Sequence, residues 1–209
     1  MKKMMYGLFF GDSITYGEYD GVFGGWVDIL KRYALQKYNE GKSNELILFN
    51  LGIDGETTEG LVKRIPNEMA ARNSAEGNIV FMGYGANDLA VKEDIQMVNP
   101  ENFKTNILKA VQEVKKYSND IYLVSILPFS SNVDGVVVAS GKLRTNDEVL
   151  IYNQILKDIA VENSLRYIDF HSAFLQDKEI LLSKDGVHPN EKGYGMMAEI
   201  AIPIIEKYL

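Results

Sequence analysis

The sequence contains no cysteine, and this absence excludes several kinds of chemistry. Without thiols the chain cannot form disulfide bonds, thiolate metal sites or a cysteine nucleophile. Histidine is also scarce, because only His171 and His188 are present. A metal site built from several histidines is therefore hard to assemble, and we expect neither a metal ion nor a cofactor.

Long apolar runs are missing as well. No stretch approaches the ~18 consecutive apolar residues that a membrane-spanning helix needs. The first residues, MKKMMYGLFFGDS, place two lysines before a short apolar run, as a secretory leader does. That run is too short, and it ends at Asp12 without a small-residue cleavage site. We therefore expect a first strand here, no membrane span and a cytoplasmic location.

The chain has no excess of basic residues. Its formal net charge is −7 and its pI is about 5.0. Nucleic-acid binding leaves a basic stripe or patch in the sequence, so a nucleic-acid partner is not expected. With 209 residues, of which 46% are hydrophobic, the sequence predicts a single domain over residues 1–209. It leaves open whether the chain forms a homo-oligomer.

Short apolar runs alternate with longer segments of helical periodicity. The runs are near-continuous, which is typical of parallel strands covered on both faces. The predicted strands are residues 5–10, 46–50, 78–83, 121–126 and 165–169. The predicted helices are residues 25–40, 102–117, 146–163 and 191–209. This alternation predicts an α/β fold, a three-layer α/β/α sandwich around a parallel sheet.

Polar clusters follow the ends of these predicted strands. In parallel sheets, functional groups collect beyond the carboxyl ends of the strands. The clusters are GDSIT at 11–15, NLG at 50–52, GYGAND at 83–88 and DGVHPN at 185–190. We therefore expect all four to meet at one edge of the sheet.

The DGVHPN cluster places Asp185 three residues before His188. A serine hydroxyl needs a base within hydrogen-bonding reach, and a carboxylate on the other ring nitrogen orients that base. Pro189 holds His188 out of the following helix, for which Asn190 is a suitable N-cap. The alternative is a loop histidine that merely precedes a capped helix.

Ser13, Gly52 and Asn87 are the other candidates. Acyl transfer develops an oxyanion, which the N–H groups of Ser13 and Gly52 and the amide of Asn87 could stabilise. Each residue also has a structural alternative: a helix N-cap for Ser13, a tight turn for Gly52 and an Asx-turn for Asn87.

Other motifs are absent or incomplete. The sequence has no G-x-S-x-G, so it lacks the nucleophile elbow of the α/β-hydrolases. GYGAND misses the last glycine of G-x-G-x-x-G, and there is no phosphate-binding G-x-x-x-x-G-K-[ST]. His171 could compete with His188 for the role of base. It lacks a D-x-x-H partner, so we expect a structural or rim role.

Residues 129–146 form a long connection after the fourth predicted strand. Connections of this length are often functional. The segment is either a surface excursion or oligomer contact, or a wall or lid over a substrate pocket. Residues 16–25 and 89–94 are further candidate pocket elements.

Taken in order, four blocks resemble the SGNH, or GDSL-type, family of serine esterases and lipases. They are FFGDSITYG, NLGIDG, GYGANDL and SKDGVHPNEKGYGMMA. The resemblance implies a flavodoxin-like sheet of order 2-1-3-4-5. It implies Ser13 as nucleophile, His188 as general base and acid, Asp185 as orienting carboxylate, and Ser13, Gly52 and Asn87 as the oxyanion hole. The first block has Ile14 where the family name has leucine.

The resemblance implies an ester hydrolase that takes a small-molecule ester. Two substrate classes remain: small or short-chain acyl esters, with carbohydrate O-acetyl groups as one candidate, and lysophospholipids or thioesters. A non-catalytic ligand-binding module on the same fold is the alternative from another class. A metal-dependent phosphodiesterase would need a carboxylate and histidine cluster that the sequence lacks.

Overall fold

The apolar runs form five parallel strands in the computed structural model, which describes residues 4–209. The strands are β1 (Met4–Gly11), β2 (Glu45–Gly52), β3 (Asn78–Gly83), β6 (Asp120–Val124) and β8 (Arg166–Ile168). Their order across the sheet is β2-β1-β3-β6-β8. Counted within this sheet alone, the order is 2-1-3-4-5, and the predicted fold is confirmed.

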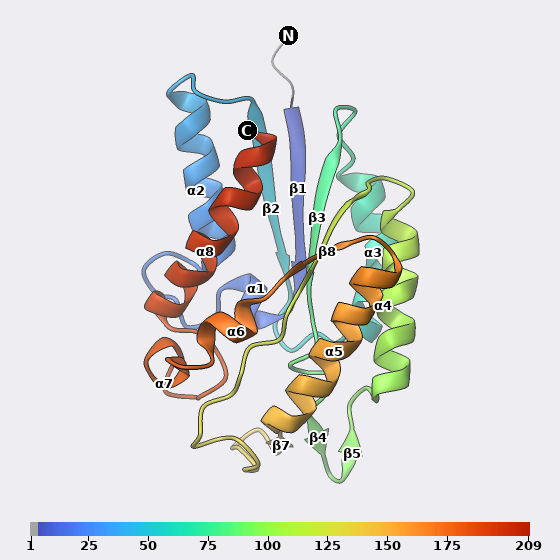
Figure 1. Cartoon of the computed structure of the whole chain (residues 1–209), viewed down its shortest axis with the longest axis vertical. Helices are drawn as coiled ribbons and strands as arrows, with labels where there is room; N and C mark the ends of the chain where they lie inside the picture. The colour runs from blue at the N-terminus through green and yellow to red at the C-terminus, as the bar shows by residue number, and fades with distance from the viewer. Residues whose placement is uncertain (1–3) are drawn as a thin grey trace.

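Helices cover both faces of the sheet (Figure 1). On one face lie α3 (Thr58–Ala71), α4 (Pro100–Val114) and α5 (Asn146–Glu162). On the other lie α2 (Trp26–Asn39) and α8 (Glu191–Ile205), which continues as η1 (Glu206–Tyr208). Successive strand residues point to opposite faces, so Phe10 packs with the first group and Phe9 with the second.

Aromatic rings fill the layer between the sheet and α2. Phe9 stacks on Phe81 with ring centroids 4.2 Å apart, and Phe81 stacks on Tyr122 at 4.8 Å. The edge of Trp26, the first residue of α2, meets Phe9 at 5.2 Å. These contacts anchor the end of β1 that leads to Ser13, since buried aromatic side chains contribute the largest apolar areas in a core.

Helix α3 is the main element that the sequence analysis did not predict. Leu61, Ile65 and Met69 are buried at spacings of four, the pattern of a helix that packs one face on a sheet. Pro66 lies inside the helix, and at the level of sequence a proline signals a break. The burial of three large apolar side chains outweighs the hydrogen bond that the proline cannot donate.

A small three-stranded sheet lies beyond the carboxyl ends of the main strands (Figure 1). It consists of β4 (Val91–Lys92), β5 (Ile95–Gln96) and β7 (Lys142–Leu143), all antiparallel. β7 belongs to the 129–146 segment, so this sheet ties that segment to the chain that follows β3. Three short helices also occur: α1 (Ser13–Tyr16), α6 (Phe170–Phe174) and α7 (Lys178–Leu181).

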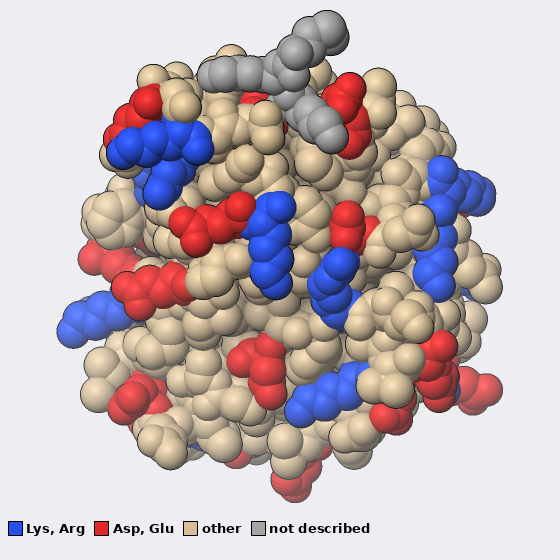
Figure 2. All heavy atoms as spheres, turned by 45° about the horizontal axis from the view of Figure 1, so that its top comes forward, with Lys and Arg blue, Asp and Glu red and all other residues tan. Residues whose placement is uncertain are grey.

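Charged side chains of both signs are interspersed on the face shown in Figure 2. Within residues 4–209, every helix is too short or too polar to cross a membrane.

Candidate active site

Ser13 lies at the carboxyl end of β1, as the first residue of α1. Asp12, not Ser13, is the N-cap, because its carboxylate accepts a hydrogen bond of 2.9 Å from the N–H of Ile14. The hydroxyl of Ser13 is therefore not used for capping. Asp12 is almost fully buried, and burial raises its pKa to about 6, although the Ile14 N–H opposes the shift.

A chain of hydrogen bonds connects Ser13, His188 and Asp185. Oγ of Ser13 lies 2.7 Å from Nε2 of His188, and Nδ1 of His188 lies 2.5 Å from Oδ2 of Asp185. Burial alone would raise the pKa of Asp185, but the hydrogen bonds from His188 and from the N–H of Val187 hold it below its ordinary value. The structure thus brings Ser13 into contact with His188, which lies 175 residues further along the chain.

The loop that carries His188 is fixed on both sides. The N–H of Ser183 donates to the carbonyl of His188 at 2.7 Å, and Oδ1 of Asp185 accepts from the His188 N–H at 3.1 Å. Asn190 caps α8 through the N–H groups of Lys192 and Gly193, as predicted. The imidazole is therefore held on a short, anchored loop.

Asn87 lines the same cavity as Ser13 and His188. Its Oδ1 accepts from Nζ of Lys142 at 3.0 Å and from Nη2 of Arg144 at 3.3 Å. Its Nδ2 donates to the carbonyl of Glu56 at 3.3 Å. The two cations fix which end of the amide is oxygen, and one N–H of Nδ2 is left for another acceptor.

Gly52 does not line the cavity beside Ser13. Its N–H donates to Oδ1 of Asn50 at 3.1 Å, and a Cβ at this position would lie 2.2 Å from the backbone nitrogen of Tyr16. A glycine is needed here because β2 passes close to the backbone of α1. The geometry does not support the expectation that the Gly52 N–H faces the reacting group.

Gly55 lines the cavity instead, and the sequence analysis did not identify it. Its φ of +69° lies in the left-handed region, which favours glycine, and a Cβ at this position would have open space around it for 4 Å. Among the described residues, no protein acceptor is found for its N–H. The signal in the sequence was the D-G pair at 54–55, a turn motif directly after the second strand.

The cavity has a volume of about 410 Å³ and includes Ser13, His188 and Asn87 in its lining. Tyr19 also lines it, with its ring 5.1 Å from that of His188. The 129–146 segment supplies one wall through Val138, Ala139, Ser140, Lys142 and Arg144. Of the expected pocket elements, residues 89–94 do not reach this cavity. His171 does not line it either: its side chain is buried in α6, and burial lowers its pKa.

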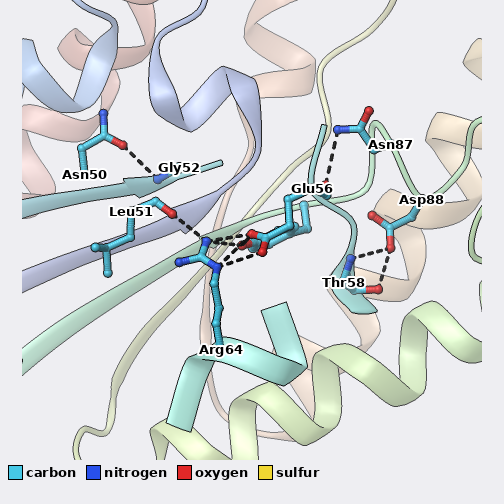
Figure 3. Close-up of polar contacts among 9 residues, drawn as sticks. Asn50, Leu51, Gly52, Glu56, Thr58, Arg64, Asn87 and Asp88 are labelled. Carbon is cyan, nitrogen blue, oxygen red and sulfur yellow. Dashed lines mark hydrogen bonds and ion pairs between the residues drawn. The ribbon is translucent and has the colours of Figure 1, made fainter. Parts of the chain in front are cut away.

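A buried ionic network lies close to Asn87 (Figure 3). Arg64 of α3 forms a two-pronged ion pair with Glu56 at 2.7–3.0 Å and also donates to the carbonyl of Leu51. Because the Glu56 carbonyl accepts from Asn87, this network joins the end of β2 to the amide of Asn87.

Asp88 lies next to Asn87 and is fully buried. Its Oδ1 accepts from the N–H and the hydroxyl of Thr58 at 2.9 and 2.5 Å, while its Oδ2 has no hydrogen-bond partner (Figure 3). Burial raises the pKa of Asp88 to about 6, although the two bonds from Thr58 oppose the shift.

The arrangement suits acyl chemistry. An imidazole within hydrogen-bonding reach of a serine hydroxyl can accept its proton, and a carboxylate on the second ring nitrogen stabilises the imidazolium that results. Among residues 4–209, no three histidine, aspartate or glutamate side chains gather as metal ligation requires. Fold and site define a class of enzymes that hydrolyse ester bonds.

Comparison with known proteins identifies the family within that class. The model of the GDSL-like lipase/acylhydrolase family matches residues 9–196, and the chain belongs to this family.

Relatives of known name are esterases and lipases. An isoamyl acetate-hydrolyzing esterase of Saccharomyces cerevisiae is 28% identical, over 96% of this chain and 86% of its own. A GDSL esterase/lipase of Arabidopsis thaliana is 25% identical, over 91% of this chain and 81% of its own.

Solved structures share the fold. A lipase/acylhydrolase from Enterococcus faecalis superimposes with a TM-score of 0.79 at 23% identity, over 99% of this chain and 97% of its own. The acetyl xylan esterase Axe2 (W215I variant) from Geobacillus stearothermophilus gives a TM-score of 0.74 at 22% identity, over 98% of this chain and 97% of its own.

Proposed function

We propose that the protein hydrolyses small or short-chain acyl esters through Ser13, His188 and Asp185, with no metal ion. Ser13 attacks the acyl carbonyl while Nε2 of His188 takes the hydroxyl proton. His188 then gives this proton to the leaving alcohol, and an acyl-serine ester remains. Water, deprotonated by the same imidazole, releases the acid and restores the serine.

The observation that carries the proposal is the continuous row from the hydroxyl to the carboxylate, with links of 2.7 and 2.5 Å. Both pairs of atoms are within hydrogen-bonding distance. The side chains of His188 and Asp185 are 16% and 29% exposed, so the imidazole remains open to the cavity and to water.

The oxyanion forms beside three donors: the N–H of Ser13, the free N–H of Asn87 Nδ2 and the N–H of Gly55. Gly55 takes the place that the sequence analysis gave to Gly52, because Gly55 lines the cavity and Gly52 donates to Asn50. Such donors stabilise the charge that develops in the transition state.

The size of the cavity supports the proposal of a small acyl group. Its volume of about 410 Å³ is at the lower end for ligand sites, and it includes charged and polar walls that do not suit a long acyl chain. The yeast relative named for isoamyl acetate and the structural neighbour named for acetyl xylan both point to acetyl esters. Hydrolysis of lysophospholipids or thioesters is the second substrate class, and a non-catalytic binding module is the alternative function.

A fluorophosphonate probe and a series of 4-nitrophenyl esters test these possibilities together. We expect a covalent adduct on Ser13, found by peptide mapping, that is lost in Ser13→Ala and kept in the remote control Ser43→Ala. We also expect kcat/KM to fall steeply beyond the butyrate ester. Retained activity on long chains would favour the second substrate class. No adduct and no turnover would favour the binding module.

A further inference from the structure

Lys142 and Arg144 bring two positive charges into the wall of the cavity beside Ser13. They are two residues apart in an extended segment, so their side chains leave the backbone on the same side. β7 pairs Lys142 with Lys92 of β4, and the carbonyls of Lys142 and Arg144 accept from Val138 and Gly135 at 3.0 and 2.8 Å. The backbone under both cations is therefore held in place.

The partners of these cations are neutral oxygens. Both contact Oδ1 of Asn87, and Nε of Arg144 donates to the carbonyl of Ala86 at 2.8 Å. The guanidinium also lies over the ring of buried Phe129, 5.8 Å from its centroid. Among the residues that the structure describes, no carboxylate lies within 4 Å of either cation.

Neighbouring acids offset the two positive charges only in part, through longer-range attraction from Asp12, Asp54 and Asp185. Asp185 is engaged by His188, and Asp54, which also lines the cavity, is exposed to solvent. Asp12 is buried beside Ser13, where burial raises its pKa to about 6. Burial lowers the pKa of both Lys142 and Arg144, and the attraction from the carboxylate of Asp12 does not fully oppose either shift.

Orienting one amide does not require two charges. A single neutral donor would fix the oxygen end of Asn87, and a partly buried cation without a counter-ion carries a cost in desolvation. Two such cations in the lining of a cavity are the arrangement that binds an anion, since Arg and Lys recognise carboxylate and phosphate groups.

We propose that Lys142 and Arg144 form an anion subsite, and that the preferred ester carries a carboxylate or phosphate group a few bonds from the scissile carbonyl. This inference rests on the proposed function, because it assigns the substrate class of that same site. The carbonyl lies at Nδ2 of Asn87, and the anionic group meets the cations at the other end of the same amide.

Pairs of esters that differ mainly in the charge of one group test the subsite. On the acyl side, mono(4-nitrophenyl) glutarate is compared with its neutral methyl ester. On the alcohol side, 3-carboxyphenyl acetate and 3-acetoxyphenyl phosphate are compared with 3-carbamoylphenyl acetate. These comparisons show whether the subsite prefers a carboxylate or a phosphate, and whether that group belongs to the acyl or the alcohol part of the ester. We expect at least one anionic ester to exceed its neutral partner about tenfold in kcat/KM, as one charge-assisted contact implies.

Variants assign the preference to the cations. Lys142→Met should bring the ratio of anionic to neutral kcat/KM close to one, and Lys142→Glu should invert it. The matched control Lys63→Met removes an exposed lysine of α3 and should leave the ratio unchanged. Because only the ratio is read, a general loss of rate in either variant does not affect the result.

Two outcomes overturn the subsite: a ratio near one for every pair in the unmodified protein, or a ratio that survives in both Lys142 variants. Either result, together with turnover of neutral esters and labelling of Ser13, leaves the proposed function standing. Absence of turnover for all esters and of labelling would instead remove the proposed function itself.

Discussion

Nδ1 of His188 lies 2.5 Å from Oδ2 of Asp185, and Oδ1 of the same carboxylate accepts from the His188 N–H at 3.1 Å. Asp185 thus holds both the ring and the backbone of the residue that faces Ser13.

Replacing Asp185 with Asn keeps the shape of the side chain and removes its charge. The imidazolium that forms during attack then loses its partner, and the ring is no longer held in one tautomer. We expect kcat to fall about 10⁴-fold, as when the carboxylate of a comparable Ser-His-Asp triad is replaced. Single-turnover kinetics measure the loss, and an unchanged circular dichroism spectrum controls for folding. A loss of less than tenfold would show that the carboxylate is not needed.

Two variants of Asn87 test whether its amide N–H donates to the oxyanion. Asn87→Ala removes both ends of the amide, whereas Asn87→Asp keeps an oxygen for Lys142 and Arg144 and removes the N–H donors. If Nδ2 donates to the oxyanion, both variants should lower kcat about 10²- to 10³-fold with little change in KM. Steady-state kinetics on 4-nitrophenyl acetate separate the cases. Recovery of activity in Asn87→Asp would assign Asn87 a purely structural role.

Gly52 and Gly55 should respond differently to alanine. At position 52 the new Cβ would lie 2.2 Å from the backbone nitrogen of Tyr16, so Gly52→Ala must displace α1 and should markedly lower the melting temperature. Position 55 has open space, and only its positive φ is unfavourable to alanine. Gly55→Ala should cost about 1–2 kcal/mol in the free energy of unfolding. Equal melting temperatures for the two variants would contradict the close approach of β2 to α1.

Arg64 of α3 and Arg72, the C-cap residue of the same helix, offer a matched pair. Side chains of Arg64 and Glu56 are 16% and 9% exposed, whereas those of Arg72 and Glu68 are 32% and 26% exposed. Arg64→Gln leaves a buried carboxylate without its partner and should lower the free energy of unfolding by about 3 kcal/mol. Arg72→Gln should cost about 0.5 kcal/mol or less. Urea denaturation measures both values, and similar losses would show that burial does not distinguish the pairs.

Asp88 should make stability depend on pH. Its pKa is raised from 3.8 to about 6 in the folded protein, so the fold favours the protonated form. The stabilisation from the protonated carboxyl is fully present below the unfolded pKa of 3.8 and is lost as the pH rises to about 6. The reason is that the carboxyl ionises at a lower pH in the unfolded chain than in the folded one. Relative to Asp88→Asn, the free energy of unfolding should fall by roughly 2 kcal/mol between pH 4 and pH 7. Parallel stability curves for the two proteins would contradict a raised pKa.

Most of the fold was predictable from short-range patterns. Near-continuous apolar runs identified all five strands of the main sheet to within two residues at each end, since strands covered on both faces have no polar side. Helix α3 was missed because Pro66 is a local signal against a helix, and only packing on the sheet overrides it. The strands β4, β5 and β7 have two residues each, too short for any periodicity to appear.

The candidate site was also predictable only in part. Ser13, Asp185, His188 and Asn87 were named because each carries its chemistry in its own side chain, next to a strand end or a turn that sequence can reveal. The glycine proposed as an oxyanion donor could not be chosen from the sequence. Gly52 and Gly55 are the same residue type and lie three positions apart. Which of their N–H groups faces the cavity depends on where the chain turns after it leaves β2.

The sequence by itself determined the order of strands and helices and the residue types available for chemistry, because periodicity and side-chain type are local properties. Tertiary structure alone decided that Asp12 rather than Ser13 caps α1, that Gly55 rather than Gly52 reaches the cavity, and that Lys142 and Arg144 stand beside Asn87. Those outcomes depend on how segments distant in the chain pack together, and the balance of burial and hydrogen bonding that settles them exists only in the folded molecule.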